Sequence, residues 1–194
     1  DGALALDRLD FASRTVTASG RGRLGAGGEE TLQIAVDIGH RDGRPVRLPT
    51  GEIAAEIGRL NWSVAAAPAE RGTHLDSKLQ VTDLAAAGSA VRDISAALSG
   101  TAPEGVLGSA AIGFDLVAEI GAIDSGDPAL NLALGEKIAM KASGSVNRSG
   151  EVAIETARLT AAAVQAEFAG RIDGGRFSGE IVARSADLTG LSDF

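Results

Sequence analysis

Apolar and polar side chains alternate along most of this chain in short segments, which are separated by glycine, asparagine, aspartate and serine. The alternation is clearest at 31–38 and 112–120, where every second residue is aliphatic or aromatic, while Asp37, Asp115 and Glu119 fall on the other side. A period of two residues is typical of antiparallel strands with one buried face and one solvated face. The pattern therefore predicts an all-β protein, built as a meander of neighbouring strands.

The predicted strands follow one another through the whole sequence, with turns at the glycine-rich stretch 20–28 and a polar loop at 40–49. Segment 53–64 also fits helical spacing, with Thr50 as a possible N-cap, but its period of two favours a strand. No helix is expected between strands, which argues against a parallel βαβ topology. The expected strands are 3–11, 15–19, 31–38, 53–64, 75–84, 91–98, 112–120, 129–134, 138–142, 152–155, 164–168 and 177–183.

The sequence also contains a distant internal repeat. A shift of 148 residues without a gap aligns 2–24 with 150–172, and pairs Leu4 with Val152, Leu6 with Ile154 and so on. Repeated β units grow in one direction, because each strand pair rests on its neighbours. We expect the chain to be a single repetitive segment, 1–194, with a possible sub-boundary in the linker-like stretch 99–105.

Length, charge and cysteine content narrow the class of protein. The chain begins at Asp1 and has no stretch of 18 apolar residues, so we expect a fragment of a longer protein whose targeting or anchoring segment lies elsewhere. A net charge of −8 and a pI near 4.8 argue against nucleic acid as a partner, because that affinity depends on Lys and Arg meeting phosphates. The chain has no cysteine, which excludes disulfides and thiolate metal sites.

The glycine-rich pattern, the histidines and the carboxylates of the chain form no convincing catalytic or metal-binding motif. The GxGxxG pattern at 20–25 is followed by another predicted strand, so no helix N-terminus is available to hold a pyrophosphate. His40 and His74 stand far apart in polar surroundings, and Asp115 and Glu119 fit the solvated face of a strand. We therefore expect neither an enzyme nor a cofactor or metal site.

Small side chains dominate the apolar positions. Only 3% of the residues are aromatic, while 26 are glycine, which is a poor composition for filling a closed core or for a membrane-barrel wall. An extended apolar sheet face must still be shielded from water, either by a second sheet, by a helix or by something apolar that the sheet holds. We expect a long antiparallel sheet that curls into a U-shaped, taco-like groove over an apolar guest.

Several phrases of the sequence resemble AsmA-like proteins and especially the TamB family. They are the Leu-x-Leu-x-x-Leu pattern of 4–11 and the Val-x-Ala-x-x-x-Gly-x-(Leu/Ile) pattern of 16–24 and 164–172. The last part of the chain looks like a recurrent TamB motif. It consists of Gly-x-Ile-x-x-Gly-x-Phe-x-Gly-x-Ile-x-Ala at 170–183, followed by Ala-Asp-Leu-Thr-Gly-Leu-Ser at 186–192. The likeness covers most of the chain and includes no catalytic signature.

The resemblance implies a periplasmic segment of a much longer protein anchored in the inner membrane. Such a protein is expected to bridge the two membranes, to shield phospholipid acyl chains in a β-groove, and to act in outer-membrane protein assembly with a TamA-like barrel. The membrane helix and the partner-binding region of the family do not match any part of this sequence. TamA contact and membrane anchoring are therefore assigned to regions outside it.

The expected groove lining consists of apolar residues at alternate strand positions. The lining candidates are Leu32, Ile34, Val36, Ile112, Phe114, Leu116, Leu130, Leu132, Leu134, Ile138, Met140, Val152, Ile154, Val164 and Phe168.

The alternative to a lipid-binding groove is a structural β-solenoid or sandwich of a secreted adhesin or autotransporter passenger. That alternative predicts a filled core with short, regular rungs.

Overall fold

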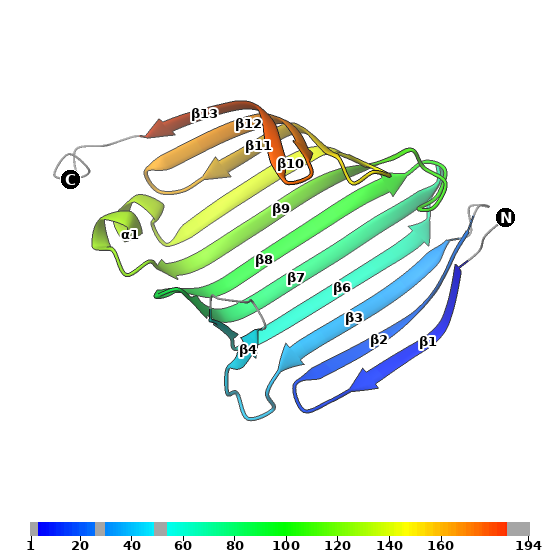
Figure 1. Cartoon of the computed structure of the whole chain (residues 1–194), viewed down its shortest axis with the longest axis horizontal. Helices are drawn as coiled ribbons and strands as arrows, with labels where there is room; N and C mark the ends of the chain where they lie inside the picture. Colours follow the sequence, from blue (N-terminus) through cyan, green and yellow to red (C-terminus); the bar gives the residue numbers. More distant parts are fainter. Residues whose placement is uncertain (1–3, 26–29, 49–53, 186–194) are drawn as a thin grey trace.

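The computed structural model describes residues 4–25, 30–48 and 54–185, and it confirms the all-β prediction. Thirteen strands form one antiparallel sheet, in which eleven strands lie side by side in chain order (Figure 1). The first six strands are β1 (Leu4–Ala12), β2 (Val16–Leu24), β3 (Thr31–Gly39), β4 (Val46–Leu48), β5 (Ala55–Ile57) and β6 (Arg59–Pro68). The others are β7 (Thr73–Ala86), β8 (Ser89–Ala102), β9 (Ala111–Asp124), β10 (Lys137–Asn147), β11 (Val152–Thr160), β12 (Val164–Asp173) and β13 (Arg176–Ser185).

The sheet is open and is not closed into a barrel. Its order is β1-β2-β3-β6-β7-β8-β9-β10-β11-β12-β13, so β1 and β13 are the two edge strands. The short strands β4 and β5 pair with each other outside this order, and β5 also pairs with the end of β7. The three longest strands, β7, β8 and β9, lie next to one another in the middle of the sheet.

Most predicted strands are confirmed, although several of them extend beyond their predicted bounds. β2 continues through Gly20 and Gly22 to Leu24, where a turn was expected, because both glycines lie opposite β3 residues in regular register. The expected polar loop at 40–49 contains β4, which pairs with β5. The ambiguous segment 53–64 forms strands in its described part, and Gly58 separates β5 from β6 by bonding to the carbonyls of Thr82 and Asp83. Thr50 and Ile53 lie outside the described residues.

The strand predicted at 129–134 is wrong, because Pro128–Leu134 forms the helix α1. Asp127 is its N-cap and accepts hydrogen bonds from the backbone N–H groups of Ala129 and Leu130, at 2.8 and 3.3 Å. Pro128 stands in the first helical turn and Gly135 ends the helix with a positive φ of 71°. An Asp-Pro start, a run of alanine and leucine, and a glycine stop are strong helix signals, and they outweigh the apparent alternation of Ala-Leu-Asn-Leu-Ala-Leu.

The possible sub-boundary at 99–105 does not coincide with a break in the sheet. β8 extends to Ala102 and stays hydrogen-bonded to β7 as far as that residue. Its pairing with β9 reaches Thr101. The described strands on both sides of this segment therefore belong to one continuous ladder.

The internal repeat found in the sequence has a counterpart in the sheet. In the β1–β2 hairpin, Leu4 lies opposite Leu24 and Leu6 opposite Gly22, and the register then shifts before Leu9. The β11–β12 hairpin has the same pairs 148 residues later, Val152 with Ile172 and Ile154 with Gly170, and its register shifts before Ala157. The two hairpins thus share both their register and the position of a β-bulge.

Close packing of backbones around glycine fixes the sheet where β10 meets β11. A Cβ atom added to Gly144 would lie 2.0 Å from the carbonyl oxygen of Ala153 and 3.1 Å from Cζ of Phe114. The register of β10 against β11 shifts at this glycine. Glycine therefore lets the β11 backbone approach and lets the Phe114 ring lie over the β10 backbone.

We expect Gly144→Ala to lower the free energy of unfolding by about 1–3 kcal/mol, because the methyl group overlaps a backbone carbonyl that cannot move without disturbing the ladder. Gly113→Ala is the matched control: it lies on the neighbouring strand, and its nearest contact would be 3.9 Å away. The control should be neutral or stabilising by about 0.5 kcal/mol. Urea unfolding followed by circular dichroism measures both, and equal stability of the two variants would contradict this account.

Candidate functional site

One face of the sheet is apolar from edge to edge, because residues that lie directly opposite each other in neighbouring strands project to the same side. Following these pairs across the sheet gives three complete rows of eleven residues, one from each long strand. The first row is Phe11, Ala18, Val36, Trp62, Leu79, Ala96, Ala118, Met140, Leu159, Ala166 and Ala183.

The second row is Leu9, Gly20, Ile34, Val64, Ser77, Leu98, Leu116, Ala142, Ala157, Phe168 and Ile181. The third is Leu6, Gly22, Leu32, Ala66, Leu75, Gly100, Phe114, Gly144, Ile154, Gly170 and Gly179. A shorter fourth row comprises Val16, Ile38, Leu60, Val81, Ile94, Ile120 and Ile138. We call these four rows the apolar face.

The apolar face contains no charged side chain and a single hydroxyl. That hydroxyl, on Ser77, accepts a hydrogen bond of 3.0 Å from the indole Nε1–H of Trp62. The two polar groups of the face thus satisfy each other, and nothing in the four rows offers an ion pair or a charged ligand a partner. The surface is suited to hydrocarbon and unsuited to polar cargo.

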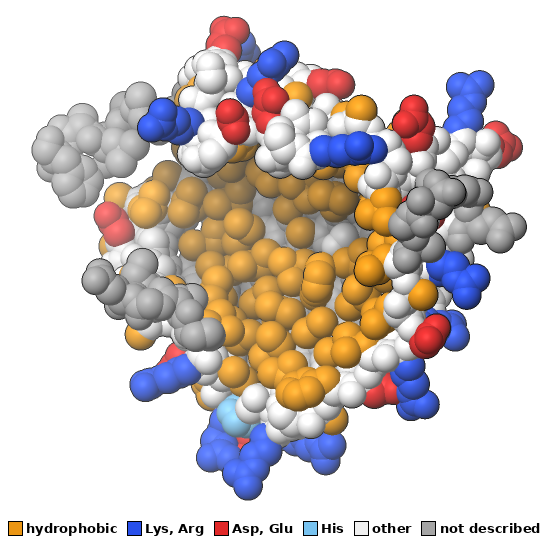
Figure 2. All heavy atoms as spheres, turned by 45° about the vertical axis from the view of Figure 1, so that its right-hand side comes forward, with side chains coloured by type: hydrophobic (Ala, Val, Ile, Leu, Met, Phe, Trp, Pro, Cys, Tyr) orange, Lys and Arg blue, Asp and Glu red, His pale blue; other side chains and the backbone are white. Residues whose placement is uncertain are grey.

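The apolar face is hollowed and remains open to solvent. Figure 2 shows hydrophobic side chains gathered in a hollow, with Lys, Arg, Asp and Glu around its outside. Trp62 is 39% exposed and Leu98 is 36% exposed, although both lie on inner strands of the sheet. Among the described residues, the buried apolar side chains are mostly alanines: Ala55, Ile57, Ala66, Val81, Ala102, Ala157 and Ala161.

Twelve of the fifteen lining candidates project from strands on this side of the sheet, and the register brings several of them into common rows. Val36 shares a row with Met140, and Ile34 shares one with Leu116 and Phe168. Ile112 and Val152 lie on either side of Val146, next to the third row. All twelve are partly exposed; they are Leu32, Ile34, Val36, Ile112, Phe114, Leu116, Ile138, Met140, Val152, Ile154, Val164 and Phe168.

Leu130, Leu132 and Leu134 do not belong to the apolar face, because they lie on α1. Leu132 is 80% exposed. Conversely, the candidates omitted several residues that complete the rows, although all but Leu159 lie in a segment where alternation was recognised. These residues are Trp62, Val64, Leu75, Leu79, Ala96, Leu98, Ala118, Leu159 and Ile181.

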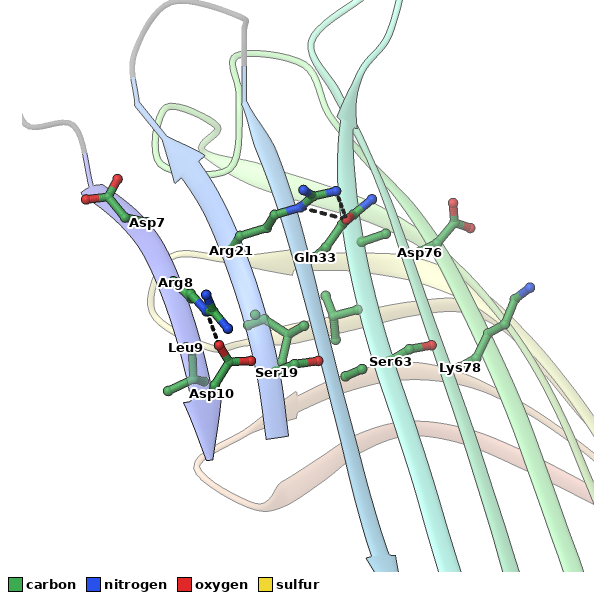
Figure 3. Close-up of a pocket in the computed structure, with 15 residues that line it drawn as sticks. Asp7, Arg8, Leu9, Asp10, Ser19, Arg21, Gln33, Ser63, Asp76 and Lys78 are labelled. Carbon is green, nitrogen blue, oxygen red and sulfur yellow. Dashed lines mark hydrogen bonds and ion pairs between the residues drawn. The ribbon is translucent and has the colours of Figure 1, made fainter. Parts of the chain in front are cut away.

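The opposite face of the sheet is polar and carries ion pairs between side chains of neighbouring strands. Arg59 bonds to Asp37, and Arg158 bonds to Glu167 on the strand beside it. A hollow of about 850 Å³ lies on this face and is lined by residues of β1, β2, β3, β6 and β7. Figure 3 shows that within it Arg21 donates two hydrogen bonds to Gln33 and that Arg8 pairs with Asp10. Its lining includes three acidic and three basic side chains, and both arginines already have partners, so this hollow offers no concentrated charge of one sign for a ligand.

The described residues hold no cluster of three or more His, Asp or Glu side chains that could bind a metal ion. His74 Nε2 lies 3.2 Å from a carboxylate oxygen of Asp76, at an exposed position of β7. Asp115 lies opposite Ser99 and Ser143 on the polar face, as its place in the alternation predicted. No helix among the described residues has the length and hydropathy to cross a membrane.

One end of the apolar face is closed by a buried carboxylate. Glu30 is 1% exposed and accepts hydrogen bonds from Thr73 Oγ1 at 2.8 Å, from Val106 N–H at 2.5 Å and from Gly25 N–H at 3.1 Å. Thr73 and Ala102, opposite each other in β7 and β8, have no exposed surface here. Glu30 thereby fixes the 103–110 loop over the ends of these strands.

The same loop is held on its other side by Arg148, from the turn between β10 and β11. The guanidinium donates to the carbonyl oxygens of Leu107, Gly108 and Ser109, at 3.1 Å for Leu107 and 3.0 Å for Ser109. We call Glu30, Arg148 and the loop 103–110 the end clamp. It connects the β2–β3 end of the sheet with the β10–β11 turn, and α1 lies at the opposite ends of the strands (Figure 1).

Comparisons with models of protein families, with curated proteins and with solved structures find no match to this chain.

Burial raises the pKa of Glu30, but hydrogen bonds from Val106, Thr73, Gly25 and Leu107 outweigh it, so the pKa lies below the ordinary value. A carboxyl whose pKa is lowered by folding stabilises the fold above its unfolded pKa, and this contribution is lost as the pH falls through the folded pKa.

We expect Glu30→Gln to lower the free energy of unfolding by about 1–3 kcal/mol at pH 7, because an amide accepts these hydrogen bonds less well and also brings unpaired donors. The difference between wild type and variant should shrink in acid, where wild-type Glu30 becomes protonated. Urea unfolding over a pH series measures this difference. A gap that stays constant into acid would show that the charge of Glu30 does not contribute.

Proposed function

We propose that the apolar face binds the acyl chains of phospholipids, and that this chain is a segment of a bridge-like lipid-transfer protein of the periplasm. The observation that carries the proposal is the three rows of eleven residues, in which Ser77 is the one polar side chain. Every side chain larger than alanine in these rows is at least partly exposed. At about 25 cal/mol per Å², shielding roughly 400 Å² of such a surface is worth about 10 kcal/mol.

The dimensions of the sheet fit this cargo. β7, β8 and β9 each have 14 residues, which corresponds to about 46 Å of strand. A single acyl layer occupies about 15 Å, half the thickness of a bilayer core. One strand length therefore accommodates a whole acyl chain, while a headgroup stays in water at the margin of the hollow.

The resemblance to the TamB family adds the wider setting to the proposal. In that setting the parent protein is anchored in the inner membrane, reaches the outer membrane, and acts with a TamA-like barrel in outer-membrane protein assembly through regions outside this segment. The adhesin or passenger alternative predicted short, regular rungs around a filled core. Strands of 9 to 14 residues along the main order of the sheet, and a hollow lined by partly exposed side chains, favour the lipid proposal.

Trp62 is the single tryptophan of the chain and lies on the apolar face, so its fluorescence reports directly on an occupant. After incubation with phosphatidylethanolamine vesicles and removal of the vesicles, lipid with brominated acyl chains should quench Trp62, because bromine within contact distance quenches indole. Unbrominated lipid should shift the emission to the blue without this quenching. Identical spectra with and without lipid would rule out acyl chains on this face.

A charge on the apolar face should abolish binding, whereas the same charge on the polar face should not. Leu98→Asp places a carboxylate in the second row, and Val117→Asp is the matched control on the polar face of the adjoining strand. The two side chains are 36% and 45% exposed, so both variants should fold. We expect Leu98→Asp to weaken binding of brominated lipid about tenfold or more, which corresponds to a loss of about 1.4 kcal/mol or more in binding free energy. Equal affinities of both variants would contradict the proposed location.

A further inference from the structure

The outer edge of β1 is a second candidate interaction surface, separate from the apolar face. In the described part of the chain β1 pairs with β2 on one side only. Eight of its nine residues are exposed, including Phe11 at 54% and Leu4 at 62%. Unpaired strand edges present backbone N–H and C=O groups to any extended polypeptide that matches their side-chain pattern.

The internal repeat shows what such an edge accepts. The β1–β2 hairpin and the β11–β12 hairpin have the same register and the same bulge, 148 residues apart. In the second hairpin the corresponding outer edge is not free, because β10 pairs with β11 there. The outer edge of β1 therefore corresponds to the edge of β11 that pairs with β10.

The bulge of β1 does not prevent this pairing. Bulges and charged side chains commonly protect edge strands from association, and β1 has both, since its register shifts between Leu6 and Leu9 and Arg8 pairs with Asp10. The bulge of β11 lies at the same position, between Ile154 and Ala157, and β10 pairs with β11 on both sides of it, with a register shift of its own at Ser143 and Gly144. The distorted edge is therefore compatible with an added strand.

We propose that the outer edge of β1 binds an extended polypeptide segment of the β10 type as an additional antiparallel strand. Such a segment has apolar residues at alternate positions and a glycine at the place of Gly144. The register follows from β10 on β11, where Met140 faces Leu159, Ala142 faces Ala157, Gly144 faces Ile154 and Val146 faces Val152. Subtraction of 148 from the β11 numbers places these four positions opposite Phe11, Leu9, Leu6 and Leu4.

Glycine is the specificity element of this segment. In β10 a Cβ at Gly144 would lie 2.0 Å from the carbonyl oxygen of Ala153. The residue equivalent to Ala153 in the first hairpin is Ala5. A partner strand with a larger residue at this place would meet the Ala5 carbonyl and lose the register.

The added strand would widen the apolar face by one more strand, because the residues at the Met140 and Val146 positions project to the same side as Phe11 and Leu4. This inference concerns an edge and not the lipid-binding surface, so it does not depend on the proposed function.

A synthetic peptide with the sequence of 137–147 is the probe. The chain has no cysteine, so the register can be mapped by disulfide formation between single-cysteine partners. The full chain with Phe11→Cys should form a disulfide with the Met140→Cys peptide, because directly opposed residues meet the geometric requirement of a disulfide. Leu9→Cys should form one with the Ala142→Cys peptide. Both protein positions are exposed, at 54% and 39%, so the variants should keep the fold.

The mismatched combination is the control. Leu9→Cys with the Met140→Cys peptide should react about tenfold more slowly, because a shift of two residues places the two Cα atoms about 9 Å apart, beyond the roughly 7 Å that a disulfide spans. A Gly144→Val version of each peptide should lose the matched disulfide.

Rates that do not depend on the cysteine positions, or that are unchanged by the Gly144→Val substitution, would overturn the proposal. A second copy of the chain could occupy the edge instead through β13, whose Ser178-Gly179-Glu180-Ile181 matches Ser143-Gly144-Ser145-Val146 of β10. Concentration-dependent self-association in sedimentation, unaffected by an excess of peptide, would assign the edge to that second copy and overturn the peptide proposal.

Discussion

The structure depends on cross-strand register, because the side chains of a strand change face at every residue. A slip of one residue anywhere would move the aliphatic side chains of a strand to the polar face. β1 shows how the chain avoids such a slip: Leu6 and Leu9 are three residues apart, which breaks the alternation, and the bulge between them returns Leu9 to the apolar face. Ile154 and Ala157 are kept in phase in the same way.

The size of the side chains decides what this register produces. Glycines such as Gly22 and Gly144 let neighbouring backbones and rings approach closely, and alanines fill much of the first row. Such side chains make the surface apolar without filling the space above it, so the hollow in Figure 2 stays open. The hydrogen bond from Trp62 to Ser77 also keeps this surface apolar, since the one indole donor on this face is satisfied by the one hydroxyl.

The sheet is closed differently at its strand ends and along its two edge strands. At one end of the strands, Glu30 and Arg148 fix a loop with several hydrogen bonds each. The lateral boundaries have no comparable closure in the described residues, since β1 and β13 are almost entirely exposed. The strand ends are therefore held by side-chain hydrogen bonds, whereas the edge strands present backbone groups for further pairing.

The sequence by itself determined that the chain forms antiparallel strands and which residues alternate, because alternation depends on neighbours along the chain. It also showed that one repeat unit returns after 148 residues, because the two copies can be aligned directly. It also contained the signals for α1, in Asp127, Pro128 and Gly135, although the alternation of leucines concealed them. Tertiary structure alone decided which strands became neighbours, that Trp62 and Leu98 complete the rows, and that Glu30 is buried. Glu30 meets Thr73 and Val106 across 43 and 76 residues of sequence, and no local pattern encodes such contacts, because they arise only when the whole ladder has formed.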